Sequence, residues 1–253
     1  MLNKCKYILL LTFSLNIIFS DEIAIVTKNN GAVKYKKDKN KSFKNKINTG
    51  MELYNNDLLV TGSDGFVMFA YLDDGSLIKV YKDSHVYVTG DLKNKIIDKK
   101  IIIDDGFLNF DIKNQKKNEF KVVTPTSVAS VKGTSFYIDI NEQKDIFYGV
   151  EGIVEILNIE SNKVLTLSKS KKITSSNDGI ITVDSIDQKD FLYLEQVQVE
   201  SGVDQEDLEQ FNDNQLDSGS LYDNNSNAVN ELIINLTNSS GENKKLRIKF
   251  IQK

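Results

Sequence analysis

Four apolar runs follow one another along the chain: EFKVVT (119–124), ASVKGTSFYIDI (129–140), DIFYGV (145–150) and GIVEILNI (152–159). Each run is rich in Val, Ile, Phe and Tyr, and each is either alternating or continuously apolar, which is typical of β-strands. Similar short runs begin at EIAIVTK (22–28) and end at GIITV (179–183). We therefore predict an all-β fold, an irregular roll or sandwich of many short strands with one short helix and a C-terminal hairpin.

Acidic residues followed by glycine separate many of these runs. The pairs are Asp64-Gly65, Asp74-Gly75, Asp105-Gly106, Glu151-Gly152 and Asp178-Gly179. Aspartate hydrogen-bonds to the backbone of its own turn and glycine accepts a positive φ, so we expect hairpin turns or β-bulges at these pairs. Their spacing is irregular, which argues against a regular solenoid.

The N-terminus is typical of a secretory signal peptide. Lys4 and Lys6 precede an apolar run of about 12 residues, Ile8–Phe19, and the small residue Ser20 follows it. A membrane anchor is the alternative, but a helix needs roughly 20 apolar residues to cross a bilayer. We expect cleavage of residues 1–20 and export to the periplasm or the outer surface of the envelope, with no transmembrane segment in the mature chain.

Composition limits the chemistry of the mature chain. The single cysteine, Cys5, precedes the apolar run and would leave with the signal peptide, so residues 21–253 can form neither a disulfide nor a thiolate metal site. Loss of Lys4 and Lys6 changes the net charge from −4 to −6. Because nucleic-acid binding requires a basic face, this acidity argues against a nucleic-acid partner.

The pattern changes after the last predicted strand. Phe191, Leu194 and Val197 recur at three-residue spacing, which predicts a helix that begins at Ser185 or Asp187. Residues beyond it are acidic and poor in apolar side chains, whereas ELIINLT and KLRIKFI near the C-terminus again have strand character. The expected divisions are a signal peptide (1–20), a β domain (21–185), a helical segment (186–202), an acidic flexible linker (203–230) and a C-terminal β-hairpin (231–253).

Residues that could support catalysis are few. The only histidine, His85, lies within a predicted strand, so a histidine-pair zinc site is excluded. Ser168 and Lys171 match the S-x-x-K of serine acyl enzymes, but that chemistry needs the serine at the start of a helix and this tract is β-rich. We expect no enzymatic activity and no cofactor.

Paired carboxylates occur at Asp73-Asp74 and Asp104-Asp105, and such pairs could serve a glycosidase or bind calcium. Neighbouring residues of a strand point to opposite faces, and aspartates are common in turns. The structural interpretation is therefore favoured over both functional ones.

Four ordered segments together resemble the FecR domain family over roughly residues 50–160. They contain Thr61-Gly62, then Asp74-Gly75-Ser76, then Thr124-Pro125 with Val131-Lys132-Gly133-Thr134 and Phe136, and finally Glu151-Gly152 with Val154. The physics of these residues is mainly structural. Pro125 holds Thr124 extended, and Gly133 permits a bulge or a close backbone approach.

The best-known FecR proteins relay signals across the bacterial envelope and combine a cytoplasmic anti-sigma segment, one membrane span and the β domain. The expected signal peptide departs from that plan, so the resemblance does not imply anti-sigma activity here. It implies a free-standing module that binds or senses another envelope protein or a cell-wall polymer. The alternatives are a purely structural or assembly protein of the envelope and, less favoured, a cell-wall hydrolase.

Overall fold

The computed structural model describes residues 22–38, 42–44, 46–115 and 118–201, together with the backbone of 230–237 and 243–250. The expected signal peptide lies outside the described residues, and so do 203–229 of the expected acidic linker. The fold below therefore concerns the expected β domain, its helix and the C-terminal strands.

The strands form two sheets that share one long strand, β8 (Ile96–Ile112). Sheet 1 contains, in spatial order, β3 (Glu52–Tyr54), β1 (Glu22–Asn30), β5 (Phe66–Tyr71), β6 (Leu77–Val80), the C-terminal part of β8, β11 (Thr134–Ile140), β12 (Lys144–Glu151), β15 (Lys171–Ser176) and β16 (Ile181–Ser185). Sheet 2 contains β2 (Val33–Lys36), β4 (Asp57–Thr61), β7 (His85–Lys93), the N-terminal part of β8, β9 (Phe120–Val123), β10 (Ser127–Val131), β13 (Ile153–Asn158) and β14 (Val164–Ser168). Neighbours pair antiparallel except β8 and β9, which are parallel.

Strand β8 passes from sheet 2 to sheet 1 at Gly106. Asp105 pairs with His85 in sheet 2, whereas Gly106 pairs with Ile140 in sheet 1. Gly106 has φ +118°, and a Cβ atom there would lie 2.1 Å from Oγ of Ser84. Asp105-Gly106 is therefore a bend within a strand, beside a register irregularity between β7 and β8, rather than a hairpin turn.

One apolar core lies between the two sheets. Inward-facing residues alternate along the strands, as in Phe136, Ile138 and Ile140 of β11, all of which are buried. The rings of Phe110 and Phe136 stack with centroids 4.9 Å apart across the β8–β11 pair. The prediction of an all-β roll or sandwich is confirmed.

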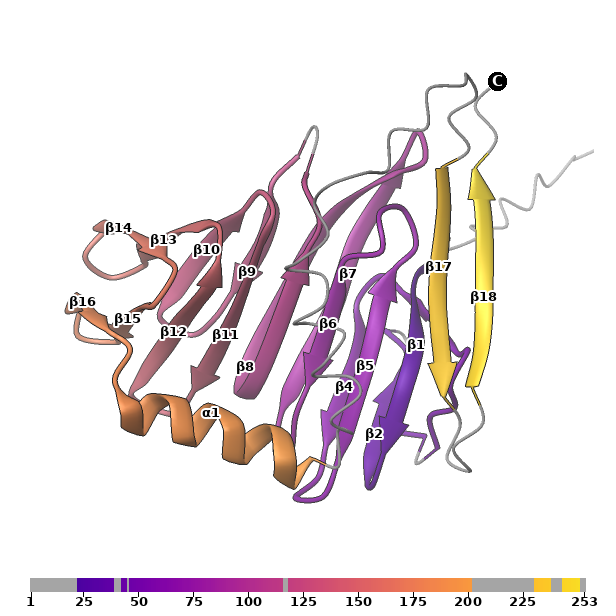
Figure 1. The fold of residues 1–253 in the computed structure, drawn as a ribbon, viewed down its shortest axis with the longest axis horizontal. Coiled ribbons are helices and arrows are strands. Elements are labelled where there is room, and N and C mark those ends of the chain that lie inside the picture. Colours follow the sequence, from indigo (N-terminus) through magenta and orange to yellow (C-terminus); the bar gives the residue numbers. More distant parts are fainter. Residues whose placement is uncertain are drawn as a thin grey trace, which may run out of the picture.

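The helix α1 (Gln188–Glu200) crosses the ends of the strands and covers part of the outer face of sheet 1 (Figure 1). Asp187 caps its N-terminus in a capping box with Asp190. Leu194 and Val197 are buried among outward-facing aromatic residues, which are Phe66, Tyr81, Phe107 and Tyr148. Two members of the predicted three-residue series, Leu194 and Val197, thus face the sheet, whereas the third, Phe191, is 57% exposed.

The C-terminal strands β17 (Asn230–Thr237) and β18 (Asn243–Phe250) form an antiparallel hairpin. Strand β17 lies alongside β1 at the edge of the molecule (Figure 1). No helix within the described part of the chain is both long enough and apolar enough to cross a membrane.

Candidate binding site

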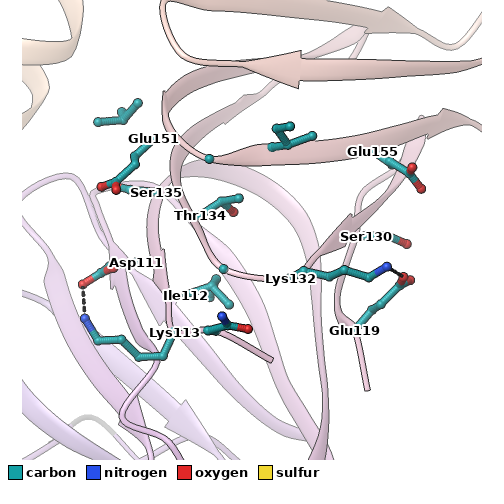
Figure 2. A pocket seen from close by; sticks show the side chains of 15 residues that line it. Asp111, Ile112, Lys113, Glu119, Ser130, Lys132, Thr134, Ser135, Glu151 and Glu155 are labelled. Carbon is teal, nitrogen blue, oxygen red and sulfur yellow. Dashed lines mark hydrogen bonds and ion pairs between the residues drawn. The ribbon is translucent and has the colours of Figure 1, made fainter. Parts of the chain in front are cut away.

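A pocket opens where the chain passes twice between the two sheets. Strand β10 of sheet 2 continues into β11 of sheet 1 through Lys132-Gly133, and β12 of sheet 1 continues into β13 of sheet 2 through Gly152. The pocket has a volume of about 820 Å³, and Figure 2 shows the side chains that line it. It is lined by Asp111–Asn114, Glu119, Ser130, Lys132–Ser135, Val150–Ile153 and Glu155.

The two passages are in contact, and this contact requires glycine. Gly133 has φ +150° and Gly152 has φ +74°. A Cβ atom on Gly152 would lie 2.7 Å from the carbonyl oxygen of Gly133, and a Cβ atom on Gly133 would lie 3.0 Å from Cα of Asn114. Both glycines therefore meet a conformational and a steric requirement of the pocket wall.

The pocket carries an excess of carboxylates. Lys113 pairs with Asp111 at 3.1 Å, and Lys132 pairs with Glu119 at 3.0 Å, as the dashed lines in Figure 2 show. The hydrogen bond from Lys132 lowers the pKa of Glu119. Glu151 and Glu155 also line the pocket, and among the described residues neither of them forms a salt bridge, although the hydrogen bond to Glu119 and, after it, the charge of Glu155 raise the pKa of Lys132. The two lysines are thus offset by four carboxylates.

Two buried hydroxyl groups in the pocket wall have no hydrogen-bond partner in the described part of the protein. Thr134 and Ser135 are each 5% exposed, and they are the first two residues of β11. A buried polar group without a partner costs roughly 1–3 kcal/mol, so such groups are few in folded proteins. Both residues line the pocket, but their hydroxyl oxygens are buried within its wall.

The Thr124-Pro125 segment lies at the opposite end of β10 and is structural. The hydroxyls of Thr124 and Thr126 both donate to Oδ2 of Asp145, and the backbone N–H of Thr126 donates to the same atom at 3.2 Å. Ser127 donates to Ser175 at 2.7 Å. Burial raises the pKa of Asp145, while the hydrogen bonds from the two threonines oppose that effect.

The Asp74-Gly75-Ser76 turn joins a second buried polar cluster. Nζ of Lys99 donates to Oδ2 of Asp73 at 2.7 Å, to Oδ2 of Asp74 at 2.8 Å and to Oε1 of Gln115 at 3.2 Å. The side chain of Gln115 also donates to Asp74, and its backbone N–H donates to the carbonyl of Lys132 at 2.7 Å. Gln115 therefore connects this cluster directly to the pocket wall.

The remaining predicted residues belong to the framework. Thr61 accepts a hydrogen bond from the N–H of Ser84 at the end of β4, and Gly62 donates to the carbonyl of Ala32. The core residues among the motif are Val131, Phe136 and Val154, all of them buried between the sheets. The structure therefore brings Lys132, Gly133, Thr134, Glu151 and Gly152 together at the pocket and places the other motif residues elsewhere.

The catalytic alternatives gain little from the geometry. Ser168 ends β14, and Lys171 donates to a different serine, Ser185, at 3.0 Å on the exposed β15–β16 edge. His85 is exposed. Asp73 and Asp74 both form salt bridges with Lys99. The described residues contain no cluster of three or more His, Cys, Asp or Glu that could hold a metal ion.

Several pocket residues were not singled out from the sequence, among them Asn114, Ser130, Ser135 and Glu155. Glu155 had a usable signal, because Ile153 and Glu155 alternate along β13 and therefore share a face. Asn114 had none, since its position depends on how the segment after β8 folds against Gly133.

Residues 57–155 match the family model described as FecR protein. This segment contains every residue that lines the pocket, and the resemblance predicted from the sequence is confirmed for it. No curated protein matches the chain.

Two solved structures are similar, both described as a "putative anti-sigma factor" from Parabacteroides distasonis ATCC 8503. One has 18% identity and a TM-score of 0.46 over 54% of this chain and 64% of its own, and the other has 16% identity and a TM-score of 0.45 over 53% and 62%. This chain thus spans less than two thirds of the length of either structure.

Proposed function

We propose that this chain, whose residues 57–155 form a FecR domain, is a non-enzymatic sensing module of the bacterial envelope. FecR proteins are sensors of the envelope, and the match supports a sensing or signalling role at that level. The module acts by contact with another envelope protein or with a cell-wall polymer. Such a role requires a recognition surface and no catalytic groups.

The pocket at the two sheet passages carries this proposal. Five residues of the FecR motif, Lys132, Gly133, Thr134, Glu151 and Gly152, line it although they come from two separate turns. Motif residues that served the framework alone would not also need to surround an open pocket. The C-terminal hairpin, by contrast, already lies against β1, which favours the pocket over the hairpin as the contact surface.

A cross-linked pull-down of the mature protein from its own envelope tests the contact. Ile153 is 61% exposed at the pocket, so Ile153→Arg places a long charged side chain there without disturbing the core. Val183→Arg is the matched control, because Val183 is 48% exposed on the edge strand β16 and does not line the pocket. We expect the wild type and Val183→Arg to capture the same partner and Ile153→Arg to lose it. Equal capture by all three proteins, or by none, contradicts the proposal.

Export is tested separately by the intact mass of the protein recovered from the cell envelope. The proposal expects the mature chain to begin at Asp21 or a close neighbour, because a short apolar run precedes it. Recovery of a membrane-bound chain that retains residues 1–20 contradicts export by cleavage.

A further inference from the structure

Among the described residues, strand β16 is an uncovered edge of sheet 1. It pairs only with β15, and on the same side of the molecule β14 ends sheet 2 (Figure 1). On the opposite side the edges are short or covered, because β3 has three residues, β2 is bridged to Lys44, and β17 lies alongside β1. Folded proteins usually shorten, charge or cover an edge, since a bare one can pair with another strand. Strand β16, with the sequence ITVDS, is five residues long and contains no Lys or Pro.

The hydrogen bonds on either side of β16 show which of its backbone groups bind β15. The N–H of Ser176 donates to the carbonyl of Ile180 at 2.9 Å, and the N–H of Ile186 donates to the carbonyl of Ser170 at 3.0 Å. Hydrogen-bonded pairs alternate with non-hydrogen-bonded pairs along an antiparallel ladder, and the register of β15 and β16 is regular. The even-numbered residues of β16 therefore direct their N–H and C=O groups toward β15.

The odd-numbered residues of β16 direct their backbone groups away from β15. These residues are Ile181, Val183 and Ser185. Their N–H and C=O groups lie along the uncovered edge at every second residue, which is the spacing that a further antiparallel strand requires. Strand addition draws its affinity from such main-chain groups.

Apolar side chains at this edge also lack a cover. Val183 pairs with the fully buried Ile173 and shares its face of sheet 1, yet Val183 is 48% exposed. Ile181, on the same face, packs against the core but is only partly buried, and so is Leu165 of β14. The core between the sheets is therefore open on the side where β14 and β16 end. A strand added to β16 covers this opening with its own core-facing side chains.

We propose that a second copy of this chain pairs with β16 through its own β16, antiparallel and with a two-fold axis at Val183. In this register the two Val183 residues face each other, and Ile181 faces Ser185 of the second copy on either side of the axis. These are the residues whose backbone groups point outward, so each of them gains a partner, and each pair exchanges two hydrogen bonds. The interface is self-complementary, as a two-fold dimer requires.

The sequence of β16 favours a second copy in this register. Asp184 lies opposite Thr182 of the second copy, whose hydroxyl can donate to the carboxylate. An axis at Asp184 would instead place two carboxylates opposite each other, and an axis at Thr182 would leave Ser185 without a partner in the strand. The two Val183 side chains meet on the core side of the joined sheet and reduce each other's exposure.

The dimer and the pocket are separable, because no residue of β16 lines the pocket. Val183→Arg places two like charges at the axis and abolishes the dimer, while the same variant still captures the partner of the pocket. A failure of the dimer and a failure of the proposed sensing function are therefore detected by different variants.

Sedimentation equilibrium of residues 21–253 tests the dimer, with Val183→Pro as the main variant. Proline removes the outward N–H of Val183 and leaves the ladder to β15 intact, which is why proline is tolerated on sheet edges. We expect a reversible dimer for the wild type and a dissociation constant raised about tenfold or more by Val183→Pro. Val164→Pro is the matched control on β14. Asn158 donates to the carbonyl of Lys163, so by the same alternation the N–H of Val164 points outward, and this variant should dimerise as the wild type does.

Disulfide cross-linking tests the register, and it decides the question alone if Val183→Pro fails to fold. Residues 21–253 contain no cysteine, so a single introduced one reports on a symmetric contact. Under mild oxidation Val183→Cys should form a covalent dimer, since the Cα atoms of a hydrogen-bonded pair lie about 5.5 Å apart. Thr182→Cys is the control, because the two copies of this position lie about 8 Å apart, beyond the roughly 7 Å that a disulfide spans.

Several results would overturn the proposed dimer. These are a wild type that remains monomeric at millimolar concentration, a dimer that folded Val183→Pro leaves unchanged, and equal weakening by Val183→Pro and Val164→Pro. Equal cross-linking of Val183→Cys and Thr182→Cys would overturn it as well, because the axis would then not lie at Val183.

Discussion

The two ends of strand β10 carry hydroxyl clusters of opposite character. At the N-terminal end, Thr124 and Thr126 donate to the buried carboxylate of Asp145. Just beyond the C-terminal end, Thr134 and Ser135 are equally buried, yet no described group of the protein binds their hydroxyls. Both clusters consist of residues with hydroxyl groups. They differ in whether a carboxylate lies within hydrogen-bonding distance of those groups.

The two hydroxyl clusters therefore have different roles in the fold. A hydroxyl cluster with an internal carboxylate joins strand ends together, because β10, β12, β13 and β15 all contribute to the Asp145 cluster through Ser127, Asp145, Asn158 and Ser175. A cluster without such a carboxylate leaves its buried hydroxyls without a hydrogen-bond partner among the described residues, next to the pocket wall. The first end therefore stabilises the fold, whereas the second end contributes buried, unpartnered hydroxyls to the wall of the pocket for which we propose a recognition role.

Removal of the carboxylate gives the largest expected effect. Asp145→Ala leaves the hydroxyls of Thr124 and Thr126 buried without their acceptor, so we expect a loss of about 3–4 kcal/mol in the free energy of unfolding. Urea denaturation measures it, and Asp184→Ala on the exposed strand β16 is the control, with a change within about 0.5 kcal/mol. If the two variants unfold at the same midpoint, the Asp145 cluster does not hold the strand ends.

Substitution of the pocket glycine comes next. Gly133→Val introduces a β-branched side chain at φ +150° and within 3.0 Å of Cα of Asn114. We expect a loss of about 1–3 kcal/mol, smaller than for Asp145→Ala because the segment beyond β8 can shift. Chemical denaturation decides this, with Gly50→Val as the control, since Gly50 also has a positive φ but no atom near its Cβ position. Equal losses in both variants would show that the contact with Asn114 is unimportant.

The pH dependence of stability tests the buried carboxylate in a third way. Burial raises the pKa of Asp145 above its value in the unfolded chain, so the folded state holds the proton more tightly. The stability contributed by this group is fully present below the unfolded pKa of about 3.9 and is lost as the pH rises through the folded pKa. Relative to Asp145→Asn, the wild type should therefore become less stable as the pH rises above about 4, by at most about 1.4 kcal/mol per pH unit.

Denaturation of the wild type and of Asp145→Asn at several pH values above about 4 measures the difference in their free energies of unfolding. A difference between them that stays constant, or that grows in favour of the wild type as the pH rises, means that the hydrogen bonds from Thr124 and Thr126 outweigh burial.

Local patterns predicted the elements of this fold well. Alternation placed strands such as β11 and β13, and the three-residue spacing of Leu194 and Val197 with the cap at Asp187 located the helix. The long strand β8 was harder, because the Asp105-Gly106 pair that usually marks a turn here marks the change of sheet. Periodicity does not show whether an Asp-Gly pair forms a hairpin turn or a bend within a strand. At Gly106 the close neighbour is Ser84, which is distant in the sequence.

The site was predicted only in part, for a similar reason. Lys132, Gly133, Glu151 and Gly152 could be singled out because they belong to a recognisable motif, but the sequence favoured a structural role for them. Their position around one pocket follows from two passages between the sheets that meet in space. The partner groups of polar residues, such as Asp145 for Thr124, likewise depend on tertiary pairing that periodicity does not encode.

The smallest effect, and the sharpest test of the comparison, comes from one substitution made at both ends of β10. Thr126→Val removes a hydroxyl that donates to Asp145, so we expect a loss of about 1–2 kcal/mol. Thr134→Val removes a hydroxyl that has no partner among the described residues and replaces it with a methyl group of similar size, so stability should stay the same or rise by up to about 1 kcal/mol.

Both threonines are 5% exposed, so the two variants are matched in burial and in the atoms exchanged. We expect the urea midpoints of the two variants to shift in opposite directions, or to shift by clearly different amounts. Equal losses in the two variants would mean that the hydroxyl of Thr134 is satisfied within the folded protein. In that case the pocket wall is framework like the Asp145 end, and the two ends of β10 do not differ in function.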